Sequence, residues 1–463
     1  MFNPKIYISR RNALSKDVAS GVILFLGNDE SPMNYTDNTY PYRQDSSFLY
    51  FFGLDMPGLT GIIDIDENKE FIFGDDVSLE DIVWMGPQKT IAEQSKSAGI
   101  NKTGSLNELV SYLSKVTSQR RKIHFIPQYR PDNLQKIERL LGIKSSAVNQ
   151  YTSIELTKAV AALRSIKSKE ELNEIEKAIK VSYEVHTKAM RISRPGLIER
   201  EVYGILSGIA DSLGNGASFP SIFSVHGETL HNHHYKNILK DGELIVHDSG
   251  VSSFMHYASD ITRTFPVTGK FSLKQKEIYQ IVLKAQMTAI NSMNPGINFR
   301  NVHLKAAKVI ASGLNDLGLM KGNVNEAVNA GAHALFFPHG LGHMLGLDVH
   351  DMENLGEVYV GYDNNSERST QFGLSYLRLA KSLKPGYVVT IEPGIYFIPE
   401  LINKWESEKK FTQFINYNKL KNYIGFGGIR IEDDIVVQNN GHSVLGKPIP
   451  KTVSDVENMC SQQ

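Results

Sequence analysis

The chain has 463 residues, more than one ordinary hydrophobic core holds, so we expect two domains. Its 50 basic and 50 acidic side chains give a formal net charge of zero, which argues against a nucleic acid or a membrane as partner, because both attract a basic excess. The single cysteine, Cys460, excludes a disulfide bond within the chain and a metal site made of thiolates. The apolar run at residues 22–26 is too short to cross a bilayer and follows no leader, so we expect a cytoplasmic protein.

The first 150 residues have the pattern of a mixed α/β domain. The apolar run at residues 21–27 predicts a buried strand, and residues 61–73 predict two strands around a turn at 67–69. Residues 122–127 are a further strand candidate. Between them, residues 40–53 (YPYRQDSSFLYFFG) are rich in aromatic side chains, and we interpret this segment as a core strand with a capped turn.

A long helix is predicted to open the second domain. Ser168 and Glu171 have the spacing of a capping box, and apolar residues then keep helical spacing up to a Pro-Gly turn at 194–196. We therefore expect an amino-terminal domain at residues 1–167 and a second domain at residues 168–463.

The second domain contains an internal repeat. A helix, a Pro-Gly turn, a second helix and a Phe-Pro pair occur twice, with the turns at residues 194–196 and 294–296. Each half continues with a turn and an apolar strand that reaches a carboxylate six residues after the turn glycine, and a second acidic residue follows on another strand. The four acidic residues are Asp248, Asp260, Glu392 and Glu432.

Carboxylates that interrupt apolar strands need partners, because an unpaired buried charge costs several kcal/mol. If the halves pack about a pseudo-twofold axis, the four acids converge near residues 338–351, which carry His339, His343 and His350. They then stay ionised only if cations neutralise them, which two divalent ions would do. Oxygen donors with one imidazole suit Mn²⁺, Co²⁺ or Zn²⁺ alike, and such sites activate water for hydrolysis. A repeat with a purely structural role is the alternative.

The order of the candidate ligands resembles a known family. The residues Asp248, Asp260, His343, Glu392 and Glu432 lie in that order, within HGLGHMLGLDVHD, TIEPGIY and GIRIEDD, and are similar to those of the pita-bread metallopeptidases. This family includes methionine aminopeptidase, Xaa-Pro aminopeptidase and prolidase, and residues 40–53 resemble the amino-terminal domain of the latter two. The resemblance implies an α/β (α+β) protein with an amino-terminal mixed α/β domain and a carboxy-terminal pita-bread domain with a pseudo-twofold repeat.

The resemblance also implies the metal site. Asp248 would bind the first of two divalent ions, Asp260 would bridge both, His343 would bind the second, and Glu392 and Glu432 would complete the pair. Mn²⁺ is the ion we expect.

Further roles follow from the same comparison. His350 would contact the scissile carbonyl, Glu392 would shuttle the proton, and His231 would line the pocket, whereas the neighbouring His233 and His234 are expected to be solvated. From the residues alone, Arg430 shares a strand face with Glu432 and could pair with a carboxylate. The substrate-binding candidates are His231, His339, His350, Arg378 and Arg430.

Two features depart from the family pattern. Asp248 and Asp260 are twelve residues apart where eleven are usual, so Asp260 would point to the wrong strand face unless a bulge in the hairpin tip at 251–256 absorbs the extra residue. Insertions at residues 362–375 and 400–423 could be lids, subunit contacts or surface loops.

The resemblance implies a dinuclear-metal Xaa-Pro aminopeptidase, which releases the first residue of peptides with proline at the second position and forms a homodimer or homotetramer. Prolidase, an Xaa-Pro dipeptidase, is the rival, because Arg378 matches a prolidase position that holds the carboxylate of a dipeptide, and the gap between Glu392 and Glu432 is prolidase-like. A pita-bread domain that only binds peptides or histones, and the metal-free branch acting on creatine-like substrates, are further alternatives; both lack this ligand set.

Overall fold

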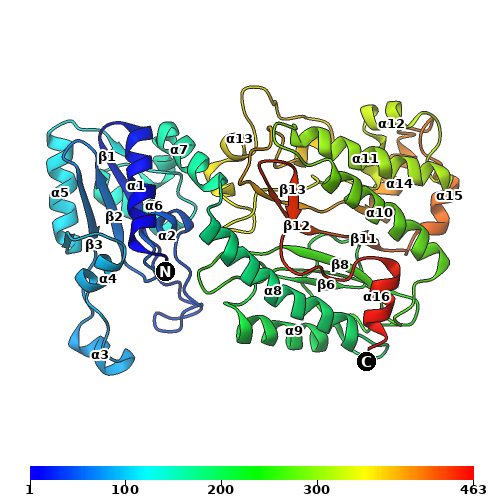
Figure 1. Cartoon of the computed structure of the whole chain (residues 1–463), viewed down its shortest axis with the longest axis horizontal. Helices are drawn as coiled ribbons and strands as arrows, with labels where there is room; N and C mark the ends of the chain where they lie inside the picture. Colours follow the sequence, from blue (N-terminus) through cyan, green and yellow to red (C-terminus); the bar gives the residue numbers. More distant parts are fainter. Residues whose placement is uncertain (463) are drawn as a thin grey trace. The chain divides into compact units, whose positions relative to one another are not determined.

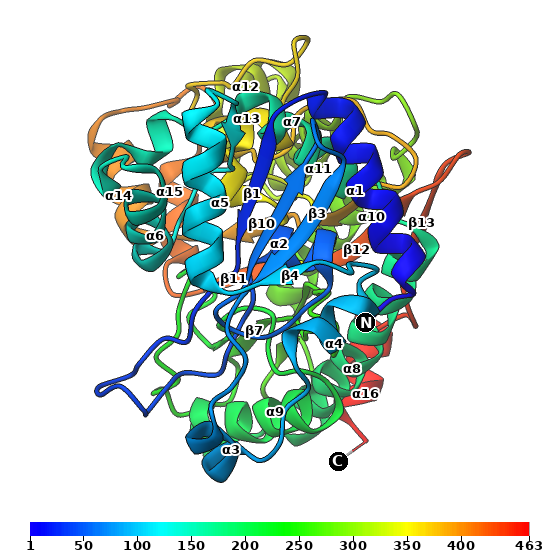
Figure 2. The same ribbon diagram turned by 90° about the vertical axis from the view of Figure 1, so that its left-hand side faces the viewer.

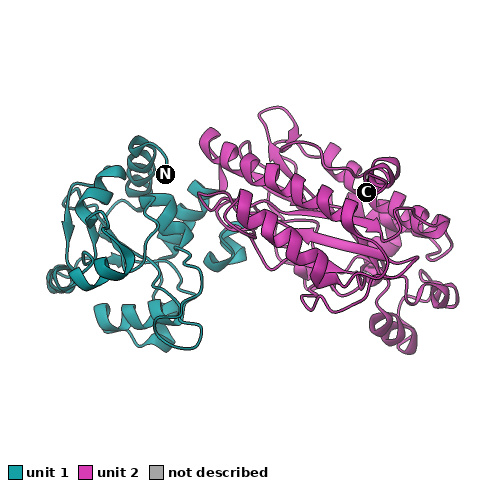
Figure 3. Cartoon of the chain, turned by 90° about the horizontal axis from the view of Figure 1, so that it is seen from below, with its two compact units in different colours: residues 1–164, 352–360 teal, residues 165–351, 361–463 magenta. Residues whose placement is uncertain are grey.

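The computed structural model describes residues 1–462, which form two compact units (Figure 3). Unit 1 comprises Met1–Arg164 and Met352–Val360, and unit 2 comprises Ser165–Asp351 and the chain from Gly361 onward. Our division into domains at residues 1–167 and 168–463 stays a prediction. A domain is a part of the chain that can fold by itself, whereas the two units are defined by their contacts alone. Within residues 1–462, no helix combines the length and the apolarity needed to span a membrane.

Unit 1 is built on a five-stranded sheet with the order β4-β3-β2-β1-β5 (Figure 2). The predicted strands are confirmed: β1, β2 and β3 pair antiparallel, whereas β5 runs parallel to β1 and β4 parallel to β3. Apolar residues of α5 and α6 pack with those of β1 to form the core of this unit. The strands are β1 (Val22–Leu26), β2 (Thr60–Asp64), β3 (Lys69–Phe73), β4 (Thr103–Gly104) and β5 (Ile123–His124). The longer helices are α1 (Pro4–Val18), α5 (Leu106–Ser118), α6 (Pro131–Leu141) and α7 (Ile154–Ser165); α3 (Leu79–Met85), α4 (Ile91–Ser97) and α13 (Glu357–Val360) are short.

The predicted strand at residues 40–53 is wrong, because the segment contains a helix, α2 (Ser46–Phe52). The Asp45 carboxylate accepts hydrogen bonds from the amides of Ser47 and Phe48, which makes it the N-cap, and Gly53 ends the helix with a positive φ of 67°. All seven helical residues are buried, so no polar face marks the helical period. Aromatic residues favour strands, yet two caps that enclose seven residues decide in favour of the helix.

Unit 2 confirms the long helix and the internal repeat. Ser168 caps α8 (Lys169–Ile192) with the predicted capping box, and α8 and α9 (Glu199–Leu213) match α10 (Leu273–Asn291) and α11 (Phe299–Asp316). The backbone bonds also repeat: the amides of the two Pro-Gly turns, Gly196 and Gly296, donate to the carbonyls of Leu239 and Leu383 at 2.9 and 2.8 Å. Both glycines have a positive φ, which the turn requires.

The strands of unit 2 lie between the two helix pairs (Figure 1). α8 and α9 pack on the sheet β6-β7-β8, and α10 packs on β9, β10 and β11. An isolated bridge joins Thr262 of the first half to Glu432 of the second half, so strands from the two halves meet in the middle of the unit. The strands are β6 (Ile222–Ser224), β7 (Leu244–Ser249), β8 (Ile261–Pro266), β9 (Val388–Ile391), β10 (Gly394–Tyr396), β11 (Gly428–Arg430), β12 (Asp433–Val437) and β13 (His442–Val444); the remaining helices are α12 (Val324–Ala330), α14 (Pro399–Ser407), α15 (Tyr417–Leu420) and α16 (Val453–Cys460).

The two insertions of unit 2 lie against each other. The ring of Phe372 contacts that of Trp405 on α14 with centroids 5.8 Å apart, and Trp405 is buried. The backbone of Phe414 and Asn416 bonds to the segment that follows α11. The second insertion is therefore anchored by packed structure, and the first insertion contacts it through Phe372, whereas most of residues 363–371 are exposed.

Candidate metal centre

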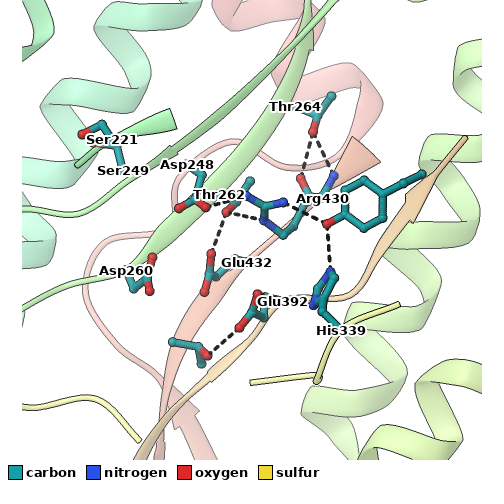
Figure 4. Close-up of polar contacts among 12 residues, drawn as sticks. Ser221, Asp248, Ser249, Asp260, Thr262, Thr264, His339, Glu392, Arg430 and Glu432 are labelled. Atoms are coloured by element: carbon teal, nitrogen blue, oxygen red, sulfur yellow. Dashed lines mark hydrogen bonds and ion pairs between the residues drawn. The ribbon is translucent and has the colours of Figure 1, made fainter. Parts of the chain in front are cut away.

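The strands of both halves bring the acidic residues together (Figure 4). Asp248 lies in β7, Asp260 directly precedes β8, Glu392 directly follows β9, and Glu432 lies between β11 and β12. His343, from the connection before β9, joins them. One ligand atom each of Asp260, His343 and Glu432 lie within 4.8 Å of one another, and all three residues are buried. This is the spacing of groups that can share one metal ion.

The strand register explains how Asp260 reaches this cluster. Asp248 pairs with Thr262 across the antiparallel strands β7 and β8, so these two side chains share a face, and Asp260, two residues before Thr262, shares it too. The hairpin tip turns at His256, which has a positive φ of 66° and donates its amide to the Ser253 carbonyl. The twelve-residue spacing therefore does not turn Asp260 away from the other carboxylates.

The acidic cluster is electrostatically unfavourable as a set of four anions. Burial raises the pKa of Asp260 and of Glu432 well above the usual range, and the neighbouring carboxylates raise both further. Burial also raises the pKa of Glu392 to about 7, although the charges of His343 and Arg430 oppose this shift. Asp248 forms an ion pair with Arg430, yet its other carboxylate oxygen, Oδ1, is buried without a hydrogen-bond partner within residues 1–462. These oxygens fit a site that cations complete.

His343 has the orientation of a metal ligand. Its Nδ1 donates to the Met344 carbonyl at 3.0 Å, because a carbonyl can only accept, so Nε2 carries the lone pair whenever the ring is neutral. That Nε2 faces carboxylate oxygens of Asp260 and Glu392 at 3.4 and 3.7 Å. A neutral ring faces two carboxylates with its lone pair, which is unfavourable unless a cation lies between them, so the donor set fits a divalent ion.

A chain of polar contacts runs from Asp248 of the acidic cluster to His339. Arg430 donates to Asp248, to Thr262 Oγ1 at 3.1 Å and to the Tyr396 hydroxyl at 2.9 Å. The Tyr396 hydroxyl lies 2.9 Å from Nε2 of His339, whose Nδ1 donates to the Gly340 carbonyl. Burial, reinforced by the charge of Arg430, lowers the pKa of His339 to about 3. The imidazole is therefore neutral, and its Nε2 accepts a hydrogen bond from the Tyr396 hydroxyl.

The other predicted residues surround the cluster. The His350 ring lies 4.3 Å from that of His343, centroid to centroid, and its charge lowers the pKa of Asp260. His231 is exposed, and burial of part of its ring lowers its pKa, with Arg430 and Asp248 close enough to act on it. The charge of Arg378 acts on His231 and His339. His233 and His234 are exposed.

Three contributing residues were missed by the sequence reasoning. Thr262 donates to Glu432 at 2.6 Å, Asp434 accepts the amide of Asp260 at 3.1 Å, and Tyr396 connects Arg430 to His339. Strand alternation could have found Thr262, because it stands two residues after Asp260. Nothing in the local sequence marks Tyr396 as polar rather than core.

Comparison with known proteins identifies the family. The profile of "Metallopeptidase family M24" matches residues 173–439, and that of "Aminopeptidase P, N-terminal domain" matches residues 7–124. The chain is 30% identical to the human Xaa-Pro dipeptidase over 448 residues, which cover 95% of this chain and 88% of that one. It is also 30% identical to the Xaa-Pro aminopeptidase of Haemophilus influenzae over 461 residues, which cover 97% of this chain and 96% of that one.

Solved structures agree with this assignment. Proline aminopeptidase P II from Yersinia pestis superposes with a TM-score of 0.83 and 27% identity over the full length of both chains. A zinc-substituted aminopeptidase P from E. coli in complex with product superposes with a TM-score of 0.81 and 28% identity over 99% of this chain and 98% of that one. The expected fold, an amino-terminal α/β domain with a carboxy-terminal pita-bread domain, is confirmed. The chain belongs to metallopeptidase family M24, among the aminopeptidase P and prolidase proteins.

Proposed function

We propose that the protein is a metal-dependent Xaa-Pro aminopeptidase that removes the first residue from peptides with proline at the second position. The observation that supports this most is the buried cluster of Asp260, His343 and Glu432, with Asp248 and Glu392 beside it. A cluster of this charge has no structural use without cations, and it lies in a chain that matches aminopeptidase P along its whole length.

Five residues would hold two divalent ions, with Mn²⁺ as the ion we expect: Asp248, Asp260, His343, Glu392 and Glu432. Divalent ions held there would supply a Lewis acid for the scissile carbonyl and lower the pKa of a water molecule. Arg430 would keep Asp248 in place, and the carbonyl of Met344, which accepts from Nδ1, would leave Nε2 of the neutral His343 ring as the ligand atom.

The remaining chemistry belongs to side chains of this chain. His350 would donate a hydrogen bond to the carbonyl oxygen of the residue before proline as negative charge develops there. A water oxygen attacks the carbonyl carbon, and Glu392 takes its proton. The C–N bond then breaks with its electron pair staying on the proline nitrogen, and Glu392 returns the proton to that nitrogen. The products are a free amino acid and a peptide that begins with proline. His231 and His339 would line the pocket for the amino-terminal residue.

The second candidate function is that of an Xaa-Pro dipeptidase. The observation in its favour is Arg378, a cation close enough to act electrostatically on both His231 and His339. The guanidinium group of Arg378 could bind the carboxylate that a dipeptide carries on its proline. In a longer peptide the proline carbonyl is part of the next peptide bond, so this carboxylate is absent. The similarity to the human Xaa-Pro dipeptidase is of the same order as that to the bacterial aminopeptidase.

We also propose a cytoplasmic homodimer or homotetramer, with neither a nucleic acid nor a membrane as partner, in keeping with the zero net charge. Helix α3 of unit 1 supports self-association, because none of its residues is buried and four of its five apolar residues are exposed. Exposed apolar residues of this density are typical of interaction surfaces. They are Leu79, Val83, Trp84 and Met85.

The test compares Xaa-Pro-Xaa tripeptides with Xaa-Pro dipeptides as substrates, with added Mn²⁺ and again after chelation. Cleavage of tripeptides that the chelator abolishes is the expected result. Cleavage of dipeptides alone would identify a dipeptidase, and no cleavage of either would overturn both functions. The Asp260→Asn variant, which has the same shape and one charge fewer, is the matched control and should be inactive.

A further inference from the structure

The segment that carries His231 is a long connection within unit 2. Residues 225–237 follow β6 and contain four histidines, all of them exposed. Within residues 1–462 the His231 side chain makes no hydrogen bond, and its ring contact is with His233 at 6.4 Å. The position of His231 therefore depends on how the backbone of this segment is held.

One buried carboxylate holds both ends of the segment. Glu199, the first residue of α9, is fully buried, and its two oxygens accept four hydrogen bonds from three donor nitrogens. The amide of Val225 donates at 2.9 Å, and the amide of Asn237 donates at 3.1 Å. The side-chain nitrogen of Asn237 reaches both carboxylate oxygens, at 3.1 and 3.0 Å. Because Val225 begins the segment and Asn237 ends it, the Glu199 side chain holds the two ends of the segment together.

The internal repeat shows that the fold does not need a carboxylate here. Glu199 stands three residues after Gly196, and its counterpart in the other half, three residues after Gly296, is Phe299. The backbone is the same: the amide of Glu199 donates to Asn237 at 3.0 Å, and that of Phe299 donates to Lys381 at 3.1 Å. Both side chains are fully buried. A buried carboxylate is costly where phenylalanine fits, so its hydrogen bonds to the 225–237 segment are the reason for it.

We propose that Glu199 is a positioning residue that closes the 225–237 segment and so holds His231 at the substrate end of the metal centre. The inference rests on the proposed function for the role of His231, and on geometry alone for the closure of the segment. Other contacts act inside the segment, such as Asn232 Nδ2 to Ser224 Oγ at 2.9 Å, but among the described contacts only Glu199 joins its two ends through one side chain.

The test is Glu199→Gln, which keeps one acceptor oxygen and points an NH₂ group at backbone donors. Glu201→Gln is the control, because Glu201 lies in the same first turn of α9, accepts the amide of Ile198, and does not touch the segment. Glu199→Gln should raise KM for an Xaa-Pro-Xaa tripeptide about tenfold, the effect of a lost charged hydrogen bond, and leave kcat within about twofold. In a His231→Ala background the same substitution should add nothing to KM.

A second readout does not depend on activity. Lys236 is exposed near the end of the segment, so trypsin should cleave after it faster in Glu199→Gln than in the wild type or in Glu201→Gln, with or without metal. Unchanged KM and unchanged cleavage would overturn the proposal, and so would a KM effect that persists without His231. If the wild type cleaves no peptide, the proposed function fails, and the trypsin result alone still decides whether Glu199 closes the segment. Should Glu199→Gln not fold, Asn237→Ala, which removes two of the four hydrogen bonds, replaces it in every assay.

Discussion

The ion pair between Lys167 and Asp351 is predicted to be a principal support of the metal centre. Lys167 Nζ lies 2.9 Å from Asp351 Oδ2, and the two side chains are 1% and 2% exposed. Asp351 follows His350 directly, and its other oxygen accepts the amide of Asp348 at 3.3 Å. Lys167→Met removes the ammonium group and should cost about 3–5 kcal/mol in unfolding free energy, because a buried charge loses its opposite charge. It should also lower kcat, because the backbone beside His350 shifts.

The chain offers a matched control and a suitable probe. Lys177 pairs with Glu174 at 2.6 Å but is 59% exposed, so Lys177→Met should cost at most about 1 kcal/mol. Urea unfolding followed by tryptophan fluorescence reports mainly on unit 2, because Trp405 is buried there whereas Trp84 of unit 1 is 82% exposed. Lys167→Met combined with Asp351→Leu should recover most of the loss. If Lys167→Met costs no more than Lys177→Met, burial does not strengthen the Lys167–Asp351 ion pair.

Three further predictions follow from the site and its surroundings. Mn²⁺ at about one hundred times its dissociation constant should stabilise the wild type by about 2.7 kcal/mol, and calorimetry should show that Asp260→Asn loses this gain; an equal gain would speak against the site. Burial lowers the pKa of His186 from 6.5 to about 3, so the folded state binds fewer protons than the unfolded state in that range, and stability falls as the pH drops below 6.5 by up to about 1.4 kcal/mol per unit. His186→Gln should flatten this slope in unfolding titrations between pH 5 and 7, and an unchanged slope would contradict the assignment. Arg378→Met should raise KM for Xaa-Pro dipeptides at least tenfold more than for tripeptides if the arginine binds a carboxylate; equal effects would exclude that role.

The sequence predicted the repeat well because its signals are local. The Pro-Gly turns need glycine at Gly196 and Gly296, and a capping box marks Ser168, so each element is visible without knowledge of its neighbours. Acidic residues within apolar strands then indicated a shared site. A buried carboxylate without a partner costs free energy wherever its strand packs, so several such residues need partners in common. The structure places Asp260, His343 and Glu432 together, and their role as metal ligands stays a prediction.

What the sequence did not predict depends on distant contacts. The helix α2 is buried on all sides, so its apolar and polar residues alternate with neither the helical nor the strand period. Only the paired caps at Asp45 and Gly53 mark it as a helix. Tyr396 could be read as core until Arg430 and His339 were seen to meet at its hydroxyl. Glu199 looks like an ordinary acidic residue in the first turn of a helix, and its role emerges only from the contacts with Val225 and Asn237.

The most direct test of the central claim is a titration of the metal-free protein with Mn²⁺, in which bound ions per chain and the rate of tripeptide cleavage are measured on the same samples. We predict that binding approaches two ions per chain, that cleavage appears only as ions bind, and that Asp260→Asn shows neither. Cleavage by protein that holds no metal, or wild-type binding by Asp260→Asn, would contradict it.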